Sequence, residues 1–574
     1  MSMKKIFTLA VAFMAVACGV QAQVDASVSA SMKIDKPIES FDYVAPIQTK
    51  ADAATFVGGT GTEADPYQIA TKEDLQKLAE LTSKAENESL ENLKGVFFKQ
   101  TADIVFEEGD KMPVIGAGAY FCGTYDGDGY MIKNFTITGK KQDSKSQVRA
   151  LFIYCKGATL KNIHMVGTKV EYDLEGADYS VLIGGLAFQV VEGKMINCTT
   201  EGTYTVRAKG EVSSSAIGGL AVSLTNSTVE NCRTYGTYLN EVAVNGGEQC
   251  YVQIGGIAAE MYNSNIIDCF TGSTMEDKAT GNVADLILRT AGIAAFAQSC
   301  QVEHVASVGE SFTSIADNKQ EGGKTTIYTA GLVAVANYKS MLSNSWSAVT
   351  TLKSEEATGS IEPAYTAFLF GDSKSENTFY ANSAEVIKEE EFINEINGKF
   401  PASAKPWLFR ENDYPSLLPL YTVTLPTLTG ATTTPGEGVA QIEEGERFRF
   451  SLVLEEEYNQ SKPVVTVGDK TLEPDANMNY VTEPVTADMV VKIDGIVKNT
   501  ETANEEINAS VQKVYVADGI LYIQPEATAQ VNVFNMQGQL VKSTLVSSEA
   551  QIQLPQGLYI VRLNDQSYKV RISE

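Results

Sequence analysis

Histidine is almost absent from this chain of 574 residues, in which His164 and His304 are the two copies. Histidine is the usual catalytic base near neutral pH and a frequent metal ligand. With two copies, catalysis or metal binding that depends on several histidines is not expected. Basic residues are also scarce beside acidic ones, 45 against 72, which gives a formal net charge of −27. Phosphate backbones repel a chain of that charge, so we expect no nucleic acid among its partners.

Long apolar runs and the common catalytic signatures are missing as well. After the N-terminal segment no stretch reaches the roughly 18 apolar residues of a membrane-spanning helix, so we expect no transmembrane span. HExxH and GxSxG do not occur, and the 8 cysteines show no CxxC spacing, so no protease, zinc or redox motif is predicted. We therefore predict no catalytic residue, no metal, no cofactor and no enzyme activity.

The N-terminus carries the pattern of an export signal. Two lysines precede an apolar run over residues 6–20, and small or apolar residues follow at the positions that a signal peptidase reads. We predict a signal peptide over 1–22, cleavage after Ala22 and a linker over 23–55. Lipoprotein processing at Cys18 is the alternative, although the leucine expected three residues before a lipidated cysteine is missing.

A short pattern recurs between residues 145 and 385. Its clear copies read Ile-Gly-Gly-Leu-Ala or Ile-Gly-Gly-Ile-Ala at 183–187, 217–221 and 254–258, and weaker copies flank them. With the large apolar residue as anchor, the copies fall at 152, 186, 220, 257, 293, 332 and 368, so the period varies from 34 to 39 residues. A unit of this length cannot bury its apolar face alone, and its copies must stack.

A cysteine follows three of these anchors at a constant distance of 12 residues. The constant front of each unit holds two strand-like segments around a tight turn, and the remainder varies in length. Stacked units of this kind predict an all-β fold, a right-handed parallel β-helix. Its repeat core is then Gly185, Leu186, Cys198, Gly219, Leu220, Cys232, Gly256, Ile257 and Cys269.

In that fold the three cysteines lie one above another. Disulfides or a thiol-bound metal are one interpretation. In-register parallel neighbours, however, hold their Cβ atoms further apart than the ~3.8 Å that a disulfide prefers, which favours a buried ladder of small side chains. The glycine pairs are interpreted as a stack at a coil corner, and Asn197, Asn231 and Asp268 as turns or an asparagine ladder.

Acidic residues in the repeat region allow two further interpretations. Asp126 and Asp128 lie in a glycine-rich turn that suits either a plain turn or a Ca²⁺ loop, and the lack of further oxygen ligands favours the turn. Glu230, Asp268 and Glu303 fall at comparable positions and are expected to be exposed strand residues, so no carboxylate pair for glycoside hydrolysis stands out.

The Gly-Gly-Leu-Ala and Asn-Cys pattern resembles the GLUG-type repeats of bacterial surface proteins, although Ala187 and Ala221 follow the leucine and no later glycine is in register. A capped helix expected from Thr71 to Leu81 and a closing segment around Trp407 are similar to the flanks of such arrays. These flanks should cover the open ends of the helix. The segments implied are an N-terminal cap with the first coils over 56–142, repeats over 143–385 and a C-terminal cap over 386–420.

The C-terminal third changes to short strands with proline and glycine turns. Residues 421–499 are predicted to form a small Ig-like β-sandwich and 500–510 a linker. Residues 511–574 resemble the type A sorting domain of the Bacteroidota type IX secretion system. This resemblance implies passage through the outer membrane by the type IX machinery, and a place at the cell surface or outside the cell. The matching positions are Gly538, Gly557, Tyr559 and Lys569.

We expect an exported adhesin that binds an unknown extracellular ligand, a glycan or a host protein. Its site should lie on the variable insertions, since solenoids bind through such insertions. One alternative is a structural surface or matrix component without a specific ligand. Another is a polysaccharide lyase or hydrolase on a β-helix scaffold, which rests on fold analogy alone. The insertions fall near 205–215, 236–250, 273–288, 312–327 and 350–363.

Overall fold

The computed structural model describes residues 56, 58–83, 91–142, 147–356, 359–411, 413–474, 478–499, 513–525, 527–564 and 566–573. The predicted signal peptide with Ala22, and the linkers over 23–55 and 500–510, lie outside these residues. The chain forms two compact units. The first holds a β-solenoid with Gly438–Phe450 and Val467–Val491, and the second holds Lys492–Glu574 with two short segments. Within the described part of the chain, no helix has the length and apolar character needed to cross a membrane.

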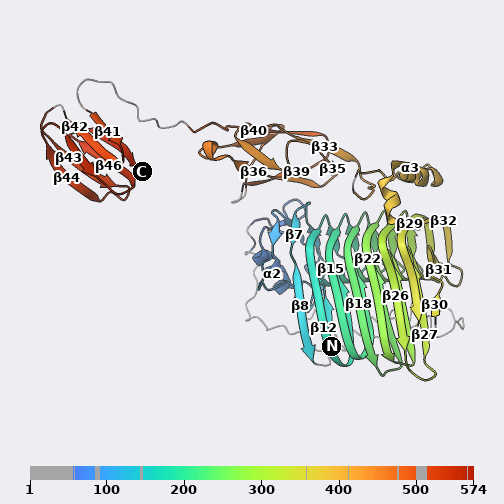
Figure 1. The fold of residues 1–574 in the computed structure, drawn as a ribbon. Helices are drawn as coiled ribbons and strands as arrows, with labels where there is room; N and C mark the ends of the chain where they lie inside the picture. The colour runs from blue at the N-terminus through green and yellow to red at the C-terminus, as the bar shows by residue number, and fades with distance from the viewer. Residues whose placement is uncertain are drawn as a thin grey trace. The chain divides into compact units, whose positions relative to one another are not determined.

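The solenoid is built from coils of four strands that stack side by side (Figure 1). One coil runs through β20 (Ala258–Tyr262), β21 (Asn265–Ile267), β22 (Phe270–Asn282) and β23 (Asp285–Ala291). Each of these strands pairs in parallel with its equivalent in the next coil. The predicted all-β fold with a parallel β-helix is therefore confirmed.

Two sheets result from this stacking. The first is nine-stranded: β2 (Glu91–Asn92), β5 (Tyr120–Phe121), β10 (Phe152–Lys156), β13 (Ala187–Val191), β16 (Ala221–Thr225), β20, β24 (Ala294–Gln298), β28 (Val333–Asn337) and β31 (Ala367–Leu369). The second sheet, of 23 strands, follows the rest of each coil in three columns.

The short column of the large sheet holds β1 (Tyr67–Ile69), β3 (Phe97–Gln100), β6 (Thr124–Asp126), β11 (Thr159–Lys161), β14 (Lys194–Ile196), β17 (Thr228–Glu230), β21 and β25 (Gln301–Glu303). The outgoing column holds β4 (Ile104–Val105), β7 (Met131–Lys133), β8 (Thr136–Gln142), β12 (His164–Gly184), β15 (Thr199–Gly218), β18 (Arg233–Asn245), β22, β26 (Ala306–Asn318), β29 (Met341–Glu356) and β32 (Lys374–Ala381). The return column holds β9 (Gln147–Arg149), β19 (Gln249–Gly255), β23 and β27 (Lys324–Ala330), and β30 (Gly359–Ile361) pairs antiparallel with β29.

Residues in the left-handed region turn the chain between strands. Asn197, Asn231 and Asp268 have φ values of 52°, 51° and 54°, a conformation that short polar side chains tolerate. The Asn197 amide donates a 3.0 Å hydrogen bond to Asn162 of the previous coil, and Asn231 donates one of 3.1 Å to Asn197. The predicted turns and asparagine ladder are confirmed.

The repeated cysteines form the expected internal ladder. Cys198, Cys232 and Cys269 are buried free thiols. The backbone N–H of Cys198 donates to Cys232 Sγ at 3.4 Å, and that of Cys232 to Cys269 Sγ at 3.3 Å. The thiols of Cys232 and Cys269 thus each accept a hydrogen bond from an amide of the preceding coil, and the Cys198 thiol donates to the Leu160 carbonyl, so the ladder has a structural role.

The repeated glycines lie where neighbouring coils touch at a corner. A Cβ added to Gly185 would lie 1.8 Å from the Gly219 carbonyl oxygen, and one on Gly219 would lie 2.0 Å from that of Gly256. No larger residue fits at that distance, so the corner requires glycine. The interpretation as a glycine stack is confirmed.

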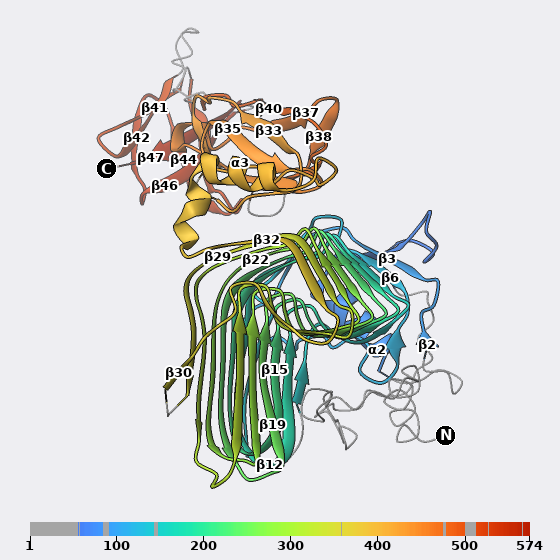
Figure 2. The ribbon, with the colours of Figure 1, turned by 90° about the vertical axis from the view of Figure 1, so that its right-hand side faces the viewer.

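The variable insertions are strands rather than loops. Outgoing and return strands extend from each coil and stack into a second lobe, which Figure 2 shows at the lower left, away from the β3 and β6 end of the coils. This lobe has its own apolar core, separate from the core inside the coils. Alternate residues such as Tyr204, Tyr238, Val252 and Leu286 fill it. The expectation that the insertions are loops is therefore wrong for most of their length, while their role in ligand binding stays a prediction.

The anchors of the central repeats stack, but those of the two outer copies were assigned wrongly. Phe152 pairs with Ala187, so Leu151 is the residue in register with Leu186. At the other end Val333 pairs with Ala367, which places Thr366 rather than Phe368 opposite Leu332. The weak copies lack the glycine pair that marks the corner, and the apolar pattern alone does not fix the register.

The two flanks of the solenoid behave differently. The N-terminal α2 (Lys72–Leu81) begins with a capping box between Thr71 and Asp74, as expected, and buries Leu75 and Leu78 in the core of the coils. In the C-terminal flank, η2 (Ala384–Lys388), α3 (Glu390–Lys399) and Trp407 pack on the outer face of β22, β26 and β29. Because these strands belong to successive coils, this flank lies along the side of the solenoid. The expectation that it covers the end of the solenoid is therefore wrong.

Two small sandwiches follow, as predicted. The first has a five-stranded sheet, β33 (Leu420–Leu425), β35 (Gly438–Glu443), β37 (Val464–Val467), β38 (Lys470–Leu472) and β40 (Met489–Asp494), and a three-stranded one, β34 (Ala431–Thr434), β36 (Arg447–Leu454) and β39 (Asn479–Pro484), with η3 (Glu456–Tyr458) in a loop. The second has β41 (Lys513–Ala517), β42 (Ile520–Gln524) and β45 (Ala550–Gln553) in one sheet and β43 (Ala529–Asn535), β44 (Leu540–Val546), β46 (Gly557–Leu563) and β47 (Gln566–Ile572) in the other, around an apolar core.

Candidate functional site

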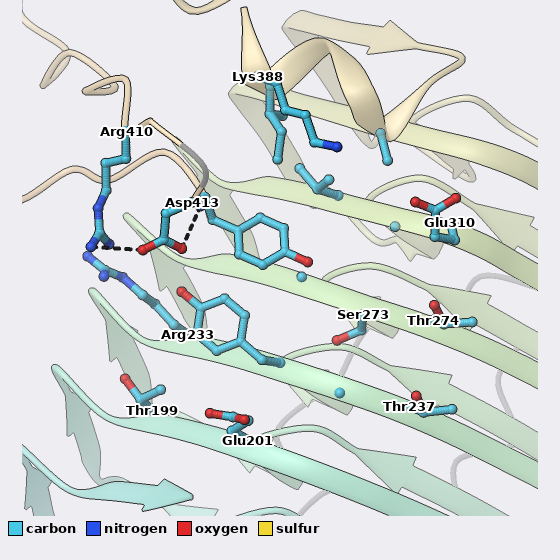
Figure 3. A pocket seen from close by; sticks show the side chains of 18 of the residues that line it. Thr199, Glu201, Arg233, Thr237, Ser273, Thr274, Glu310, Lys388, Arg410 and Asp413 are labelled. Carbon is cyan, nitrogen blue, oxygen red and sulfur yellow. Dashed lines mark hydrogen bonds and ion pairs between the residues drawn. The ribbon is translucent and has the colours of Figure 1, made fainter. Parts of the chain in front are cut away.

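A cleft of about 820 Å³ lies on the outer face of the solenoid, where β15, β18, β22 and β26 begin and the C-terminal flank passes over them (Figure 3). We name it the tyrosine cleft. Its walls are Thr199, Glu201, Arg233, Tyr235, Gly236, Thr237, Gly272, Ser273, Thr274, Val308, Gly309, Glu310, Ala384, Glu385, Ile387, Lys388, Arg410, Asp413, Tyr414 and Glu446.

The strand alternation explains why these residues face outward. The cysteines of the ladder point into the core, so the third residue after each of them points away from it. Those third residues are Glu201, Tyr235 and Gly272, which pair with one another and with Val308 across the sheet. Aligning the repeats on their cysteines brings this column together. That alignment is the sequence signal for the cleft, and the variable length of the insertions does not contain it.

Two tyrosines from distant parts of the chain meet in the cleft. The rings of Tyr235 and Tyr414 are 5.3 Å apart with an interplanar angle of 32°, and Tyr414 also lies 5.1 Å from Phe270. Gly272 makes room for them, because a Cβ there would lie 2.7 Å from the Tyr414 ring and 3.0 Å from Tyr235. Both tyrosines are half-buried, so each is held in place while part of its surface stays accessible.

Both phenols are neutral over the physiological pH range. Burial raises the pKa of Tyr235 and of Tyr414 above the ordinary value of 10.0. A tyrosine acts as a base only when ionised. These rings are therefore suited to stacking and hydrogen bonding rather than to proton abstraction.

The arginines of the cleft are bound to the protein's own carboxylates. The Arg233 guanidinium donates to the carboxylate of Glu443, whose other oxygen accepts a 2.9 Å hydrogen bond from Arg410. Arg410 also pairs with Asp413 at 2.8 Å. Glu443 is 1% exposed, so this cluster is a buried structural contact.

A different set of groups lies on the other side of the cleft. In Figure 3, Glu310, Thr274 and Thr237 lie away from Arg233, Arg410 and Asp413, and Glu201 projects near Thr199. Glu201 and Glu310 are exposed, and neither forms an ion pair with any residue that the structure describes. The cleft therefore presents hydroxyls and the Glu310 carboxylate away from the arginines, and the Glu201 carboxylate beside Thr199.

One carboxyl at the cleft edge has unusual acidity. Burial, and then the neighbouring Glu443, raise the pKa of Glu446 above the ordinary value of 4.5. A carboxyl with a raised pKa keeps its proton nearer to neutrality, as a general acid must. It is the feature of the cleft with most relevance to catalysis.

The predicted repeat-core residues take no part in the cleft. Gly185, Leu186, Cys198, Gly219, Leu220, Cys232, Gly256, Ile257 and Cys269 are buried in the coils or at their corners. Of the predicted sorting residues, Gly538 lies in the turn between β43 and β44 with a φ of 79°, Gly557 and Tyr559 in β46, and Lys569 on the exposed face of β47. Tyr559 is 7% exposed and donates a 2.8 Å hydrogen bond to the Pro555 carbonyl.

The acidic turn residues are neutralised rather than arranged for a cation. Asp126 accepts the N–H of Asp128 at 2.9 Å and pairs with Lys161 at 3.0 Å, while Asp128 pairs with Lys99 at 3.2 Å. The plain turn is confirmed. Among the described residues no cluster of three or more His, Cys, Asp or Glu side chains could hold a metal.

Asp268 is not the exposed strand residue that was expected. It is 8% exposed, sits at a left-handed corner, and pairs with His304 Nδ1 at 2.7 Å and with Lys405 at 2.5 Å. Lys405 comes from the C-terminal flank, whose docking covers the position. Glu230 and Glu303 are exposed as predicted.

Comparison with known proteins adds one domain and one weak likeness. Residues 501–572 match a family of domains of unknown function, DUF6383. No curated protein matches the chain. A solved structure named IgA1 Protease aligns with 55% of this chain at 14% identity and a TM-score of 0.30, and the aligned part spans 21% of that protein.

Proposed function

We propose that this chain is an exported adhesin, at the cell surface or in the medium, whose solenoid binds an extracellular glycan in the tyrosine cleft. The observation that carries the proposal is the tilted Tyr235–Tyr414 pair inside a concave site of about 820 Å³. Ligand sites of this kind usually measure about 300–1,000 Å³ and combine aromatic walls with a few polar groups.

The groups around the ring pair suit a sugar. The apolar C–H face of a pyranose can lie on an aromatic ring, which gains stacking as well as buried area. Sugar hydroxyls would meet Thr237 and Thr274 and could donate to the carboxylates of Glu201 and Glu310. A flat protein surface fits a concave site less well, so we favour a glycan over a host protein.

Export is the second part of the proposal. It is supported by the N-terminal lysines and apolar run ending at Ala22, and by the C-terminal sandwich, whose turn and strand positions resemble a type IX sorting domain. That sandwich has its own apolar core, as a separately recognised module would. The type IX secretion machinery is the partner that this resemblance implies, and the resemblance of the repeats to the GLUG type is in keeping with a surface protein.

Glycan binding can be tested with the mature full-length protein on a glycan array. We expect Tyr414→Ala to weaken binding at least about tenfold, because it removes one ring of the pair. Tyr414→Phe keeps the ring and should bind like the parent.

The matched control is Tyr365→Ala. Tyr365 and Tyr380 form another tilted pair on the solenoid, 4.6 Å apart and outside the cleft. If no glycan binds, or if Tyr365→Ala weakens binding as much as Tyr414→Ala, the cleft is not the site. Absence of any ligand would favour the structural surface component instead.

Polysaccharide hydrolysis is the second candidate, favoured by the raised pKa of Glu446. Hydrolysis would require a second carboxylate across the bond, about 5–10 Å away, for which Glu201 or Asp413 would have to serve. If a bound glycan releases reducing ends, and Glu446→Gln abolishes this release, the protein is an enzyme rather than an adhesin.

A further inference from the structure

We infer that the tyrosine cleft selects a saccharide without acidic groups and rejects sialylated, uronate-containing or sulfated glycans. This inference rests on the proposed glycan-binding function and names the class of ligand. It follows from which charged groups at the cleft are already paired and which remain open to a ligand.

The first step concerns the cations. A site for an anionic sugar needs a guanidinium or ammonium group free to pair with it. Arg233 and Arg410 both donate to Glu443, and Arg410 also pairs with Asp413. Lys388 pairs with Glu385 at 2.6 Å, but both side chains are exposed, so this pair holds its cation less firmly than Glu443 holds the arginines.

The second step concerns how firmly the arginines are held. Glu443 is 1% exposed and accepts from both guanidinium groups. Arg233 donates further to Ser416 Oγ at 3.3 Å. An incoming carboxylate or sulfate that took Arg233 and Arg410 from Glu443 would leave that buried carboxylate unpaired in the protein, which is strongly unfavourable.

The third step concerns the carboxylates that remain open to a ligand. Glu310 lies away from the arginines and Glu201 lies near Thr199 (Figure 3), and neither has an ion-pair partner in the described part of the chain. Carboxylates accept hydrogen bonds and repel other anions. They suit the hydroxyl donors of a neutral sugar, and equally the ammonium of an amino sugar.

The whole chain acts in the same direction. Its formal net charge of −27 raises the cost of bringing a polyanion to the surface, especially at low ionic strength. The local and the global charge therefore select the same ligand class.

The test compares three forms of one oligosaccharide on the mature full-length protein by titration calorimetry: neutral, acidic through sulfation or a uronate, and N-deacetylated. We expect the acidic form to bind at least about tenfold more weakly than the neutral form. The neutral or the N-deacetylated form should bind best. Comparing these two forms shows whether the cleft prefers hydroxyl groups or an ammonium group.

A variant separates charge from shape. The double variant Glu201→Gln with Glu310→Gln keeps the side-chain volume but removes both charges. It should reduce the difference in affinity between the acidic and the neutral form severalfold. Glu192→Gln, at an exposed turn outside the cleft, is the control and should leave this difference unchanged.

Two different failures can be told apart. If an acidic glycan binds as tightly as its neutral form, and Tyr414→Ala abolishes that binding, the inference is wrong while the cleft remains a glycan site. If no saccharide of any charge binds, the proposed function fails and the inference falls with it.

Discussion

At the scale of single residues, the lobe formed by the insertions contains a buried polar row that the apolar pattern did not reveal. Ser354, Thr329, Ser314 and Thr290 are linked by hydrogen bonds of 2.8 Å, and Thr290 donates at 2.7 Å to Asp277 Oδ2. These hydroxyls all donate in one direction and end on the carboxyl of Asp277, which is 0% exposed. Such a row satisfies polar groups inside a core without a charge.

Asp277 should make the stability of the protein depend on pH. Burial raises its pKa to about 8 from the ordinary 3.8, so the folded protein keeps it protonated while the unfolded chain ionises it. The unfolded state therefore gains stability between about pH 4 and pH 8, by about 1.4 kcal/mol per pH unit from this group. Asp277→Asn removes that penalty and should be increasingly more stable than the parent as the pH rises through this range.

Urea unfolding of both proteins at pH 5, 6 and 7 measures the effect. Asp173→Asn, on the partly exposed face of β12, is the control and should follow the parent. Parallel pH profiles for the parent and Asp277→Asn would show that Asp277 is ionised in the folded state.

At the scale of elements, the sequence identified the coils but not the lobe beside them. The coil corners and the cysteine ladder need nearly identical residues in each copy, since backbones approach within contact distance there. In the apolar part of the lobe, residues of different size and shape occupy equivalent alternate positions, as Tyr204, Tyr238, Met275 and Phe312 do. Because the insertions vary in length and in residue identity, the sequence pattern indicated loops where the structure has a folded core.

The lobe should respond to mutation as a core. Tyr238 is 0% exposed and stacks near Tyr204 with centroids 5.3 Å apart. Tyr238→Ala should lower the free energy of unfolding by about 3–5 kcal/mol, as large-to-small changes in cores do. Glu241→Ala, on the exposed side of the same strand, should change it by less than about 0.5 kcal/mol, and chemical denaturation compares the two. Equal and small effects would mean that the insertion behaves as a loop after all.

Spacing along the chain could have identified the column of Glu201, Tyr235 and Gly272, but not the complete cleft. Tyr235 belongs to the repeat and Tyr414 to the flank, and the flank was expected over the end of the coils rather than along their side. Trp407 was already marked as part of the closing segment, but which face it covers depends on the outward row of Phe270, Ala306 and Trp346, which only the strand register brings together.

At the scale of the whole molecule, the C-terminal sandwich is separable from the part that would bind ligand. The buried residues of its apolar core lie between Leu521 and Ile572, Val514 and Val516 pack against them, and the segment lies in a different compact unit from the solenoid. A domain with its own core can be removed without exposing the core of another. Removal of residues 500–574 should therefore leave glycan binding and the main thermal transition of the remaining chain unchanged.

The same removal should abolish export if the sandwich is read by the type IX machinery. In a bacterium with that system, the shortened protein should accumulate inside the cell envelope, while the full chain reaches the surface or the medium. Lys569→Ala distinguishes recognition from misfolding, because Lys569 is exposed and its loss should leave the melting temperature of the sandwich unchanged. Reduced export at an unchanged melting temperature would assign Lys569 to the recognised surface. Normal export of the shortened chain would instead make the sandwich an ordinary structural domain and leave only the N-terminal signal to direct the protein.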